Sequence, residues 1–319
     1  MTHISIKQAC LAIGQGNVVV FPTETVYGLG ADACNDAAVA QVFALKNRPT
    51  FNPLIVHVAS LEAAQKIAIF NEQALKVAHM FWPGPLTLVL PKKLSAGISL
   101  LASAGLDTIG VRIPAHPVAQ EFLQTVGCPI AAPSANPSGY LSPTSVDHIQ
   151  GYFGDQLLVL DGGCCHVGLE STIIDLSNEM PILLRPGGVT QEALSKELGP
   201  LAYRSHEGIP NAPGQLLSHY APRIPLRMHA TYVRAREAYL GFGKHELAGG
   251  AALLNLSSKG DLVEAAAHLF AYLHELDNSE YEGIAVAPIP EKGLGVAIND
   301  RLRRSMGACT LRTEAAFTI

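Results

Sequence analysis

The sequence predicts an α/β protein with two domains. Short apolar runs rich in β-branched residues alternate with segments of helical period along most of the chain, as expected where strands alternate with helices. The length of 319 residues favours about two domains, and 48% hydrophobic with 15% charged residues is ample for a buried core. A proline-containing stretch, 205–224, interrupts the alternation, so we expect domains at 1–204 and 225–319 with a semi-stiff linker between them.

The N-terminal residues predict an amphipathic helix. Ser5 and Gln8 have the spacing of a capping box. The start of the chain lacks the basic, apolar and small-residue parts of a signal peptide, and no apolar run approaches the ~20 residues that a membrane span requires. We therefore expect a cytoplasmic protein without a membrane partner.

The stretch from Val18 to Val58 organises the first domain. A strand, Val18–Phe21, ends at Pro22 and leads through a polar turn into a helix with Asp36 as its expected N-cap; a second strand, Leu54–Val58, follows. The turn holds Thr23, Glu24, Thr25, Gly28 and Gly30, and the far helix end holds Lys46 and Arg48. This strand–turn–helix–strand unit predicts a site for a small anionic ligand.

The remainder of the first domain continues the alternation. We expect helices at 60–69, 72–81, 117–126, 142–152 and 190–198, with Asn71 and Thr190 as N-caps. We expect strands at 86–90, 108–114, 157–160, 168–175 and 182–188. Residues 129–139 predict a short strand that runs into a turn with Ser134, Asn136 and Ser138, which taken alone is typical of a tight loop.

The second domain shows a shorter α/β pattern. We expect strands at 224–228, 251–256 and 283–287 and helices at 232–240 and 262–276. It contains no GxGxxG motif and no nucleophile elbow, so its sequence indicates an open sheet without visible chemistry.

Basic residues are scarce, and this makes their positions informative. The net charge is −5, from 22 basic and 27 acidic residues, which argues against a broad face for nucleic acid. Residues 1–203 hold ten Lys or Arg, and four of these lie inside or beside apolar strands or turns: Lys46, Arg48, Arg112 and Arg185. Long cations in such places usually have an anionic partner, a carboxylate or a phosphate.

Other patterns leave the chemistry open. Six cysteines without a CxxC pair favour free thiols, and Cys164–Cys165–His166 lacks a second pair at zinc spacing, so we expect no metal bound by the protein alone. His57 alternates with apolar residues and is typical of a core histidine, while Glu24 and Glu170 are acid–base candidates that no spacing pairs. Without a Walker loop, the patterns predict only a small-molecule α/β enzyme.

Taken together, several motifs closely resemble the YrdC-type domain, in matching order and spacing over nearly all of residues 10–200. They are PTETVYGLG, KNRP with NPLIVHV, FWPGPLTLVL, DTIGVR, IAAPSAN, DGG, and GLESTII with LLRPG. This domain is shared by L-threonylcarbamoyladenylate synthases and by larger carbamoyltransferases of hydrogenase maturation. The HYAP-bearing linker and the second α/β region resemble the long, two-domain synthase. The resemblance implies a twisted open mixed sheet flanked by helices, plus a smaller Rossmann-like open α/β domain.

The resemblance also implies a reaction. L-threonine, bicarbonate and ATP would give threonylcarbamoyl-AMP and pyrophosphate, with Mg²⁺ bridging the phosphates. The product would pass to a tRNA-modifying transferase that makes threonylcarbamoyladenosine, so tRNA would be met only indirectly. Transfer at phosphorus depends on positioning and on cancelling negative charge, which calls for cations and N–H groups more than for a nucleophile.

The family pattern further implies which residues bind each substrate. Threonine would contact Thr25, His57, Arg112, Ser171 and the backbone of Ala132. ATP and its magnesium would contact Lys46, Arg48, Asn52, Thr108, Ser134, Asn136, Ser142 and Arg185, with His219 and Tyr220 added from the linker. Of these, Lys46, Arg48, Ser134 and Asn136 would be the catalytic set.

One departure and two rival functions belong to this expectation. The resemblance implies that the linker is a lid over ATP that donates His219 or Tyr220. The linker departs from the family pattern at Leu216 and Ser218, where relatives commonly carry cations. The rivals are an RNA-binding or ribosome-assembly module of the YrdC type, which predicts salt-dependent RNA binding, and a carbamoyltransferase, which predicts consumption of carbamoyl phosphate.

Overall fold

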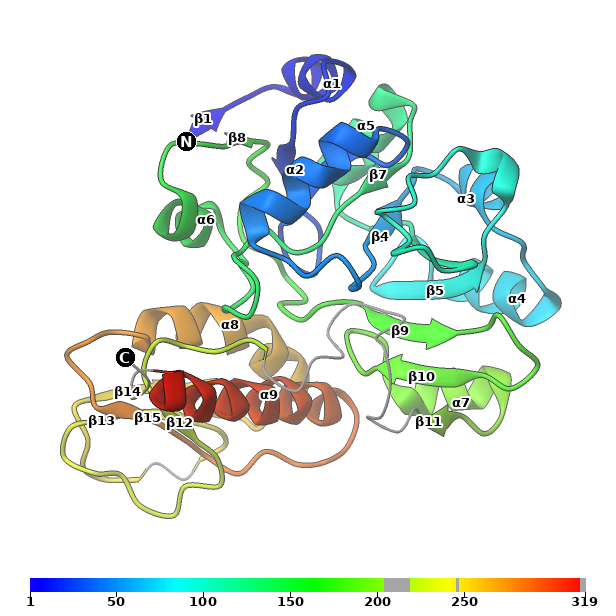
Figure 1. Ribbon diagram of the computed structural model, residues 1–319. Coiled ribbons are helices and arrows are strands. Elements are labelled where there is room, and N and C mark those ends of the chain that lie inside the picture. The colour runs from blue at the N-terminus through cyan, green and yellow to red at the C-terminus, as the bar shows by residue number, and fades with distance from the viewer. Residues whose placement is uncertain (204–218, 245–246, 316–319) are drawn as a thin grey trace.

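The protein is described by a computed structural model that covers residues 1–203, 219–244 and 247–315 (Figure 1). These residues form two sheets. The larger one has the strand order β1-β8-β2-β3-β7-β4-β6-β5-β9-β10-β11 and mixes parallel with antiparallel pairs; the smaller one has the order β12-β15-β13-β14, with every pair parallel. Most of the predicted linker, 205–218, lies outside the described residues.

The strands of the larger sheet come from residues 2–203. In chain order they are β1 (Thr2–His3), β2 (Val19–Phe21), β3 (Gly28–Asp32), β4 (Ile55–His57), β5 (Leu86–Pro91), β6 (Thr108–Arg112), β7 (Ile130–Ala131), β8 (Leu158–Val159), β9 (Thr172–Asp175), β10 (Ile182–Arg185) and β11 (Ala202–Tyr203). The helices are α1 (Ile6–Gly14), α2 (Asp36–Lys46), α3 (Leu61–Ile67), α4 (Glu72–Phe81), α5 (Pro117–Val126), α6 (Val146–Phe153) and α7 (Gln191–Leu198), with a short 3₁₀ turn at Leu94–Ala96.

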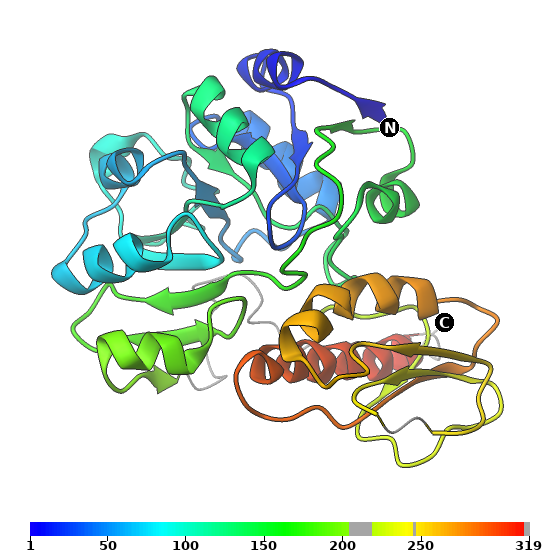
Figure 2. The same ribbon diagram turned by 180° about the vertical axis from the view of Figure 1, so that it is seen from behind.

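Alternation along β2 places helices on both faces of the larger sheet. Val19 and Phe21 pack with α1 and α5, while Val20 belongs to the core that includes α2 and α4. The helices α1 and α5 lie together on one side in both views (Figures 1 and 2). Both faces of the sheet are therefore covered, as in α/β proteins.

The second unit contains β12 (Leu226–Arg227), β13 (Glu237–Gly241), β14 (Ala252–Asn255), β15 (Gly283–Val286), α8 (Leu262–Leu276) and α9 (Leu294–Ala315). Its apolar core continues into the first unit through Val26, Leu141 and Leu169. A Cβ at Gly168, whose φ is +69°, would lie 2.4 Å from Ala266 O of α8. Only glycine permits this approach, so the two units are closely packed (Figures 1 and 2).

Several sequence predictions are confirmed. The capping box of Ser5 and Gln8 is present, Asn71 and Thr190 cap α4 and α7, and the predicted bounds of α4, α5 and α8 are those observed. No helix in the described part of the chain is long and apolar enough to cross a membrane.

The helix predicted at 232–240 is wrong. Residues 237–241 instead form β13, which is buried along its length and lies between two parallel strands. Arg227 donates two hydrogen bonds to the carboxylate of Glu237, which lets this acidic residue stand in a buried strand. Tertiary pairing thus overrides local propensity here.

Two further differences concern the stretch that organises the first domain. The N-cap of α2 is Asn35, whose side chain accepts from Ala38 N at 3.1 Å, and Asp36 is the first helical residue. Gly28 and Gly30 lie in β3, a strand that pairs antiparallel with β2. A Cβ at Gly30 would lie 2.8 Å from the Phe21 ring, so this glycine makes room for a core aromatic residue.

Candidate active site

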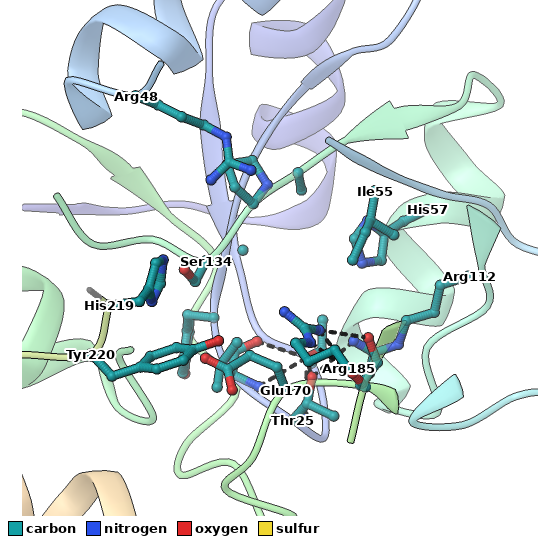
Figure 3. Close-up of a pocket in the computed structure, with 17 residues that line it drawn as sticks. Thr25, Arg48, Ile55, His57, Arg112, Ser134, Glu170, Arg185, His219 and Tyr220 are labelled. Carbon is teal, nitrogen blue, oxygen red and sulfur yellow. Dashed lines mark hydrogen bonds between the residues drawn. The ribbon is translucent and has the colours of Figure 1, made fainter. Parts of the chain in front are cut away.

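A cavity with about 550 Å³ of empty space lies where strand ends of the larger sheet meet the segment at residues 219–220. Its lining combines apolar side chains with several convergent polar and charged groups, which is typical of a small-molecule site. Ten predicted site residues line it: Thr25, Arg48, His57, Arg112, Ala132, Ser134, Ser171, Arg185, His219 and Tyr220. In Figure 3, Arg48, Ser134, His219 and Tyr220 lie on one side and His57 and Arg112 on the other, with Arg185 between.

Arg112, at the end of β6, is held by three partners from two segments. Its Nη2 donates to Glu24 Oε1 at 2.6 Å, its Nη1 to Thr25 Oγ1 at 2.9 Å, and its Nε to Gly84 O at 3.2 Å. The side chain is 4% exposed. A guanidinium has five N–H groups, so two remain on Nη1 and Nη2 for a ligand. This is the arrangement needed to bind a carboxylate with two hydrogen bonds.

His57 lies beside Arg112 because β4 and β6 pair in parallel with these residues in register. Burial, with the charge of Arg112, lowers the pKa of His57 to about 3, so its imidazole is neutral near pH 7. Its ring meets Phe21 edge-on, and its Nδ1 has no hydrogen-bond partner among the described residues. The residue that the spacing suggested for the core therefore faces the cavity.

Lys46 is fully buried at the end of α2 and holds the turn after β7. Its Nζ donates to Ser134 O at 2.6 Å and also to Asn136 O, and its own carbonyl accepts from Ser138 N at 2.7 Å. Burial and the charge of Arg48 lower its pKa well below the usual range. The Ser134 side chain is thereby presented to the cavity, while Lys46 and Asn136 lie behind it rather than among the lining residues.

Arg48 is the cation that reaches the cavity from this loop. Its Nε donates to Asn52 O at 3.1 Å and its Nη2 to Pro53 O at 2.9 Å. Burial lowers its pKa to about 9. The Asn52 side chain is fully buried, and neither its oxygen nor its nitrogen has a hydrogen-bond partner among the described residues. An unsatisfied buried amide is expensive, and this one leaves a donor and an acceptor free in the loop that carries Arg48.

Arg185 approaches from β10 and is anchored to Ser171. Its Nη2 donates to Ser171 O at 2.8 Å, and the Ser171 hydroxyl is 2.7 Å from that of Thr87. Burial lowers the pKa of Arg185. The neighbouring Glu170 lines the same cavity. Burial opposes its charge, but the guanidinium groups of Arg301 and Arg185 outweigh this effect and lower its pKa to about 2.

His219 and Tyr220 close the cavity from the side of the second unit. Both are buried, and neither His219 Nδ1 nor the Tyr220 hydroxyl has a hydrogen-bond partner among the described residues. Burial lowers the pKa of His219 to about 3. Tyr220 has φ +61°, which is unusual for a residue other than glycine. Two neutral polar rings are thus held in the lining of the cavity.

The remaining predicted residues lie near the cavity or away from it. Ser142 is buried and donates to Glu170 Oε1 at 2.5 Å. Thr108 begins β6, four residues before Arg112, which places it about 13 Å away along an extended strand. The N–H of Ala132 donates to Ile55 O at 2.9 Å, so only its carbonyl is left for a ligand.

The cavity carries an excess of buried positive charge. Among the described residues, Lys46, Arg48 and Arg185 form no salt bridge with a carboxylate, and burial lowers the pKa of each. Buried cations of this kind need a negative partner. The site therefore suits a polyanion. These cations are enclosed, unlike the exposed stripe that would track a nucleic-acid backbone.

Residue spacing missed the arginine partners of Glu24 and Glu170, and it missed Arg301 altogether. Glu24 and Glu170 were considered for acid–base chemistry, but both oxygens of each are occupied, by Arg112 and Ala115 N and by Ser142 and Arg301. Arg301 itself comes from α9, which no sequence pattern predicted. A buried glutamate with no local cation was the available signal, because such a group requires a distant partner.

Comparisons with known proteins cover nearly the whole chain. A family described as "Telomere recombination" matches residues 11–187, and one described as "Threonylcarbamoyl-AMP synthase, C-terminal domain" matches residues 189–307. The threonylcarbamoyl-AMP synthase of Pyrococcus abyssi is 39% identical, over 95% of this chain and 94% of its own length. That of Bacillus subtilis is 36% identical, over 96% and 94%.

The solved structures include a close relative with a bound ligand. The crystal structure of P. abyssi Sua5 complexed with L-threonine matches with a TM-score of 0.87 at 36% identity, over 96% of this chain and 97% of that one. The agreement extends over both sheets.

Proposed function

The chain belongs to the threonylcarbamoyl-AMP synthase family in its long, two-domain form, and we propose that its reaction takes place in the cavity of Arg48, Arg112 and Arg185. Enzymes of this family are ATP-using synthases of the nucleotidyltransferase type, and this protein is one of them. Its division into a catalytic domain at 1–204, a linker at 205–224 and a second domain at 225–319 is part of the proposal.

The proposed chemistry has two steps. The amine of L-threonine attacks bicarbonate to give a carbamate with loss of water. A carbamate oxygen then attacks the α-phosphorus of ATP, and pyrophosphate leaves as the bond to the β-phosphate breaks. Both steps join negatively charged reactants, so enclosing them among cations lowers the barrier through positioning and charge cancellation.

The threonine end of the cavity is proposed to lie at Arg112. Its two free N–H groups would bind the carboxylate of threonine, and Thr25 with Ser171 would orient the substrate by their hydroxyls. Neutral His57 supplies an unpaired ring nitrogen at this end. The crystal structure of the P. abyssi relative, which contains L-threonine, supports this substrate class.

The ATP end is proposed to lie at Arg48, Ser134 and Arg185. Arg48 and Arg185 would bind phosphate oxygens, and Lys46 would fix the turn that carries Ser134. Asn52, Asn136, Ser142 and Thr108 complete the proposed nucleotide set, with His219 and Tyr220 covering it. The observation that carries this proposal is the excess of buried cations beside unsatisfied polar atoms of Asn52, Asn136, His219 and Tyr220.

Magnesium is proposed to enter with ATP, bound to its phosphates. The donor groups around the cavity do not fit a resident Mg²⁺, because the carboxylates of Glu24 and Glu170 are already tied to arginines. Among the described residues, no cluster of three His, Cys, Asp or Glu side chains could hold a metal ion.

The product is proposed to pass to a tRNA-modifying transferase. Threonylcarbamoyl-AMP is a mixed anhydride, so it carries an activated acyl group that a transferase can move to an adenosine amine. The enclosed cations and the net charge of −5 support a protein that meets tRNA only through such a partner.

Release of pyrophosphate tests the proposal. We expect pyrophosphate to be released from ATP only when L-threonine and bicarbonate are both present. In one control serine replaces threonine, and in the other the buffer contains no bicarbonate. ATP turnover that is indifferent to threonine would contradict the assignment. Consumption of carbamoyl phosphate instead would favour a carbamoyltransferase.

A further inference from the structure

Arg301 is a fully buried arginine that the second unit inserts into the first. It lies on α9, yet its Nε donates to Glu170 Oε2 at 2.7 Å and its Nη2 to Pro186 O at 3.0 Å. Its Nη1 donates to Asp300 Oδ2 at 2.7 Å, so all three nitrogens are bonded. The guanidinium carbon also lies 5.1 Å from the centre of the Tyr220 ring. One side chain thus touches both a cavity glutamate and a cavity tyrosine.

Glu170 transmits the position of Arg301 to the polar groups of the cavity. Its second oxygen accepts from Ser142 Oγ at 2.5 Å. The next residue, Ser171, supplies the carbonyl and hydroxyl that receive the Arg185 guanidinium. The carbonyl of Pro186, which follows Arg185, is bonded by Arg301 itself. Arg301 therefore fixes the position of Arg185 in two ways. It bonds the carbonyl of Pro186, the residue after Arg185, and it holds Glu170, the residue before the Ser171 that accepts from Arg185.

Helix α9 also fixes the segment that closes the cavity. Ser305 Oγ donates to Tyr220 O at 2.7 Å, and His219 N donates to Arg304 O at 3.3 Å. The unusual backbone of Tyr220, with φ +61°, is thereby held between α9 and the Gly139 carbonyl, which accepts from Ala221 N at 2.8 Å. The contacts of α9 thus include His219 and Tyr220, which are proposed for ATP. They also include Glu170, which accepts from Ser142 of the same set. The partners of Arg112 all come from the first unit.

We propose that Arg301 is a positioning residue for the nucleotide end of the cavity, so that the second domain completes the ATP site and leaves Arg112, the proposed carboxylate partner of threonine, in place. This inference rests on the proposed function. Removing Arg301 would leave the Glu170 carboxylate buried without its cation. It would also remove the cation–π contact between the guanidinium and the Tyr220 ring. Arg185 would then turn toward Glu170 and away from phosphate.

Calorimetric titration of the full-length protein tests this role. The probes are L-threonine and an ATP analogue with a methylene bridge between the α- and β-phosphates. In Arg301→Met we expect the affinity for the analogue to fall about tenfold or more, because small displacements of binding groups are costly. We expect the affinity for threonine to stay within about twofold, because the partners that hold Arg112 all come from the first unit. Arg301→Lys keeps the positive charge but loses the planar guanidinium group. Its affinity for the analogue should lie between those of Arg301→Met and the unchanged protein.

The matched control is Arg303→Met on the same helix. Arg303 is half exposed and pairs with Glu291 on the surface, so both affinities should match the unchanged protein. Thermal unfolding of each variant shows whether it is folded, and Arg301→Lys replaces Arg301→Met if the latter is not.

The outcomes separate the two proposals. If the unchanged protein binds no analogue, the proposed function itself fails. If it binds the analogue and the Arg301 variants bind equally well, only the positioning role is overturned. A parallel loss of both affinities would indicate a merely structural residue and would also overturn the role.

Discussion

Lys46 Nζ lies 2.6 Å from the carbonyl oxygen of Ser134, and this contact joins the end of α2 to the turn after β7. The two segments are 88 residues apart in the sequence. The cation therefore shapes the turn from behind while the Ser134 side chain faces the cavity. A substitution of Lys46 should therefore affect the stability of the turn as well as the activity.

Replacing Lys46 with Met should lower both stability and activity. Two buried carbonyls lose their donor, and an unsatisfied buried group costs about 1–3 kcal/mol. We expect the free energy of unfolding in urea to fall by this order, and pyrophosphate release to fall with it. Lys7→Met, at an exposed position in α1, is the control. Normal stability with lost activity would mean that Lys46 touches the substrate and not only the turn.

Arg48→Ala should nearly abolish pyrophosphate release while threonine still binds. Arg48 lies on the far side of the cavity from Arg112, and losing a group that stabilises developing charge costs about 100-fold or more in rate. Rates are measured with both substrates saturating, and threonine affinity is measured by calorimetry. Arg236→Ala removes an exposed arginine that pairs with Glu282 and should change neither quantity. An active Arg48→Ala protein would remove this residue from the proposed ATP site.

Arg112→Lys should weaken threonine binding selectively. A lysine has only three N–H donors, so it cannot replace the bonds to Gly84 O, Thr25 and Glu24 and still bind a substrate carboxylate. One charge-assisted hydrogen bond is worth about 1.5–3 kcal/mol. We expect the dissociation constant for threonine to rise about tenfold or more, with ATP-analogue affinity unchanged. The control is Arg227→Lys, which alters a similar two-bond pair with Glu237 in the second unit. Equal effects of the two substitutions on threonine would contradict the assignment.

Stability should fall as the pH drops below 6.5, partly because of His274. Burial and the nearby His148 lower the pKa of His274 from 6.5 to about 3. The unfolded chain therefore takes up this proton first. The loss begins below pH 6.5 and is complete near pH 3, with none above pH 6.5. Between these limits the group contributes up to about 1.4 kcal/mol per pH unit.

The substitution His274→Phe tests this linkage. The two histidine rings stack with centroids 3.9 Å apart, between α6 and α8, and a phenyl ring can keep this contact without titrating. Unfolding in urea at pH 7.5 and at pH 5.0 should show a smaller drop in the variant than in the unchanged protein. An identical drop would show that His274 does not take part.

Much of the fold could be predicted from local patterns. Helices α4, α5 and α8 have clear apolar periodicity and capping residues, so their bounds were predicted correctly. The strand β13 was predicted as a helix because EAYL has no strand signature of its own; its neighbours in the parallel sheet decide its conformation. Similarly, β3 contains two glycines that suggest a turn, and the packing of the Phe21 ring against both and of Ile130 against Gly30 explains them.

The candidate site was predictable as far as family motifs reach. Ten of the residues implied by the resemblance line one cavity. Spacing alone could not find this set, because Arg112 and Glu24 are 88 residues apart and Arg301 and Glu170 are 131 apart. Ion pairs over such separations leave no local periodicity. The only sign of such a pair in the sequence is a glutamate among apolar residues, with no cation nearby in the sequence.

The distance in sequence between Glu170 and Arg301 has a consequence for the order of synthesis. A ribosome makes Glu170 first and must add 131 residues before Arg301 exists. At about 5–20 residues per second, this interval is roughly 7–26 s. Throughout it, Arg48 and Arg185 have already been made, but Glu170 lacks its partner Arg301. If Arg301 positions the nucleotide end as proposed, a nascent chain would bind ATP more weakly until α9 has left the ribosome and docked.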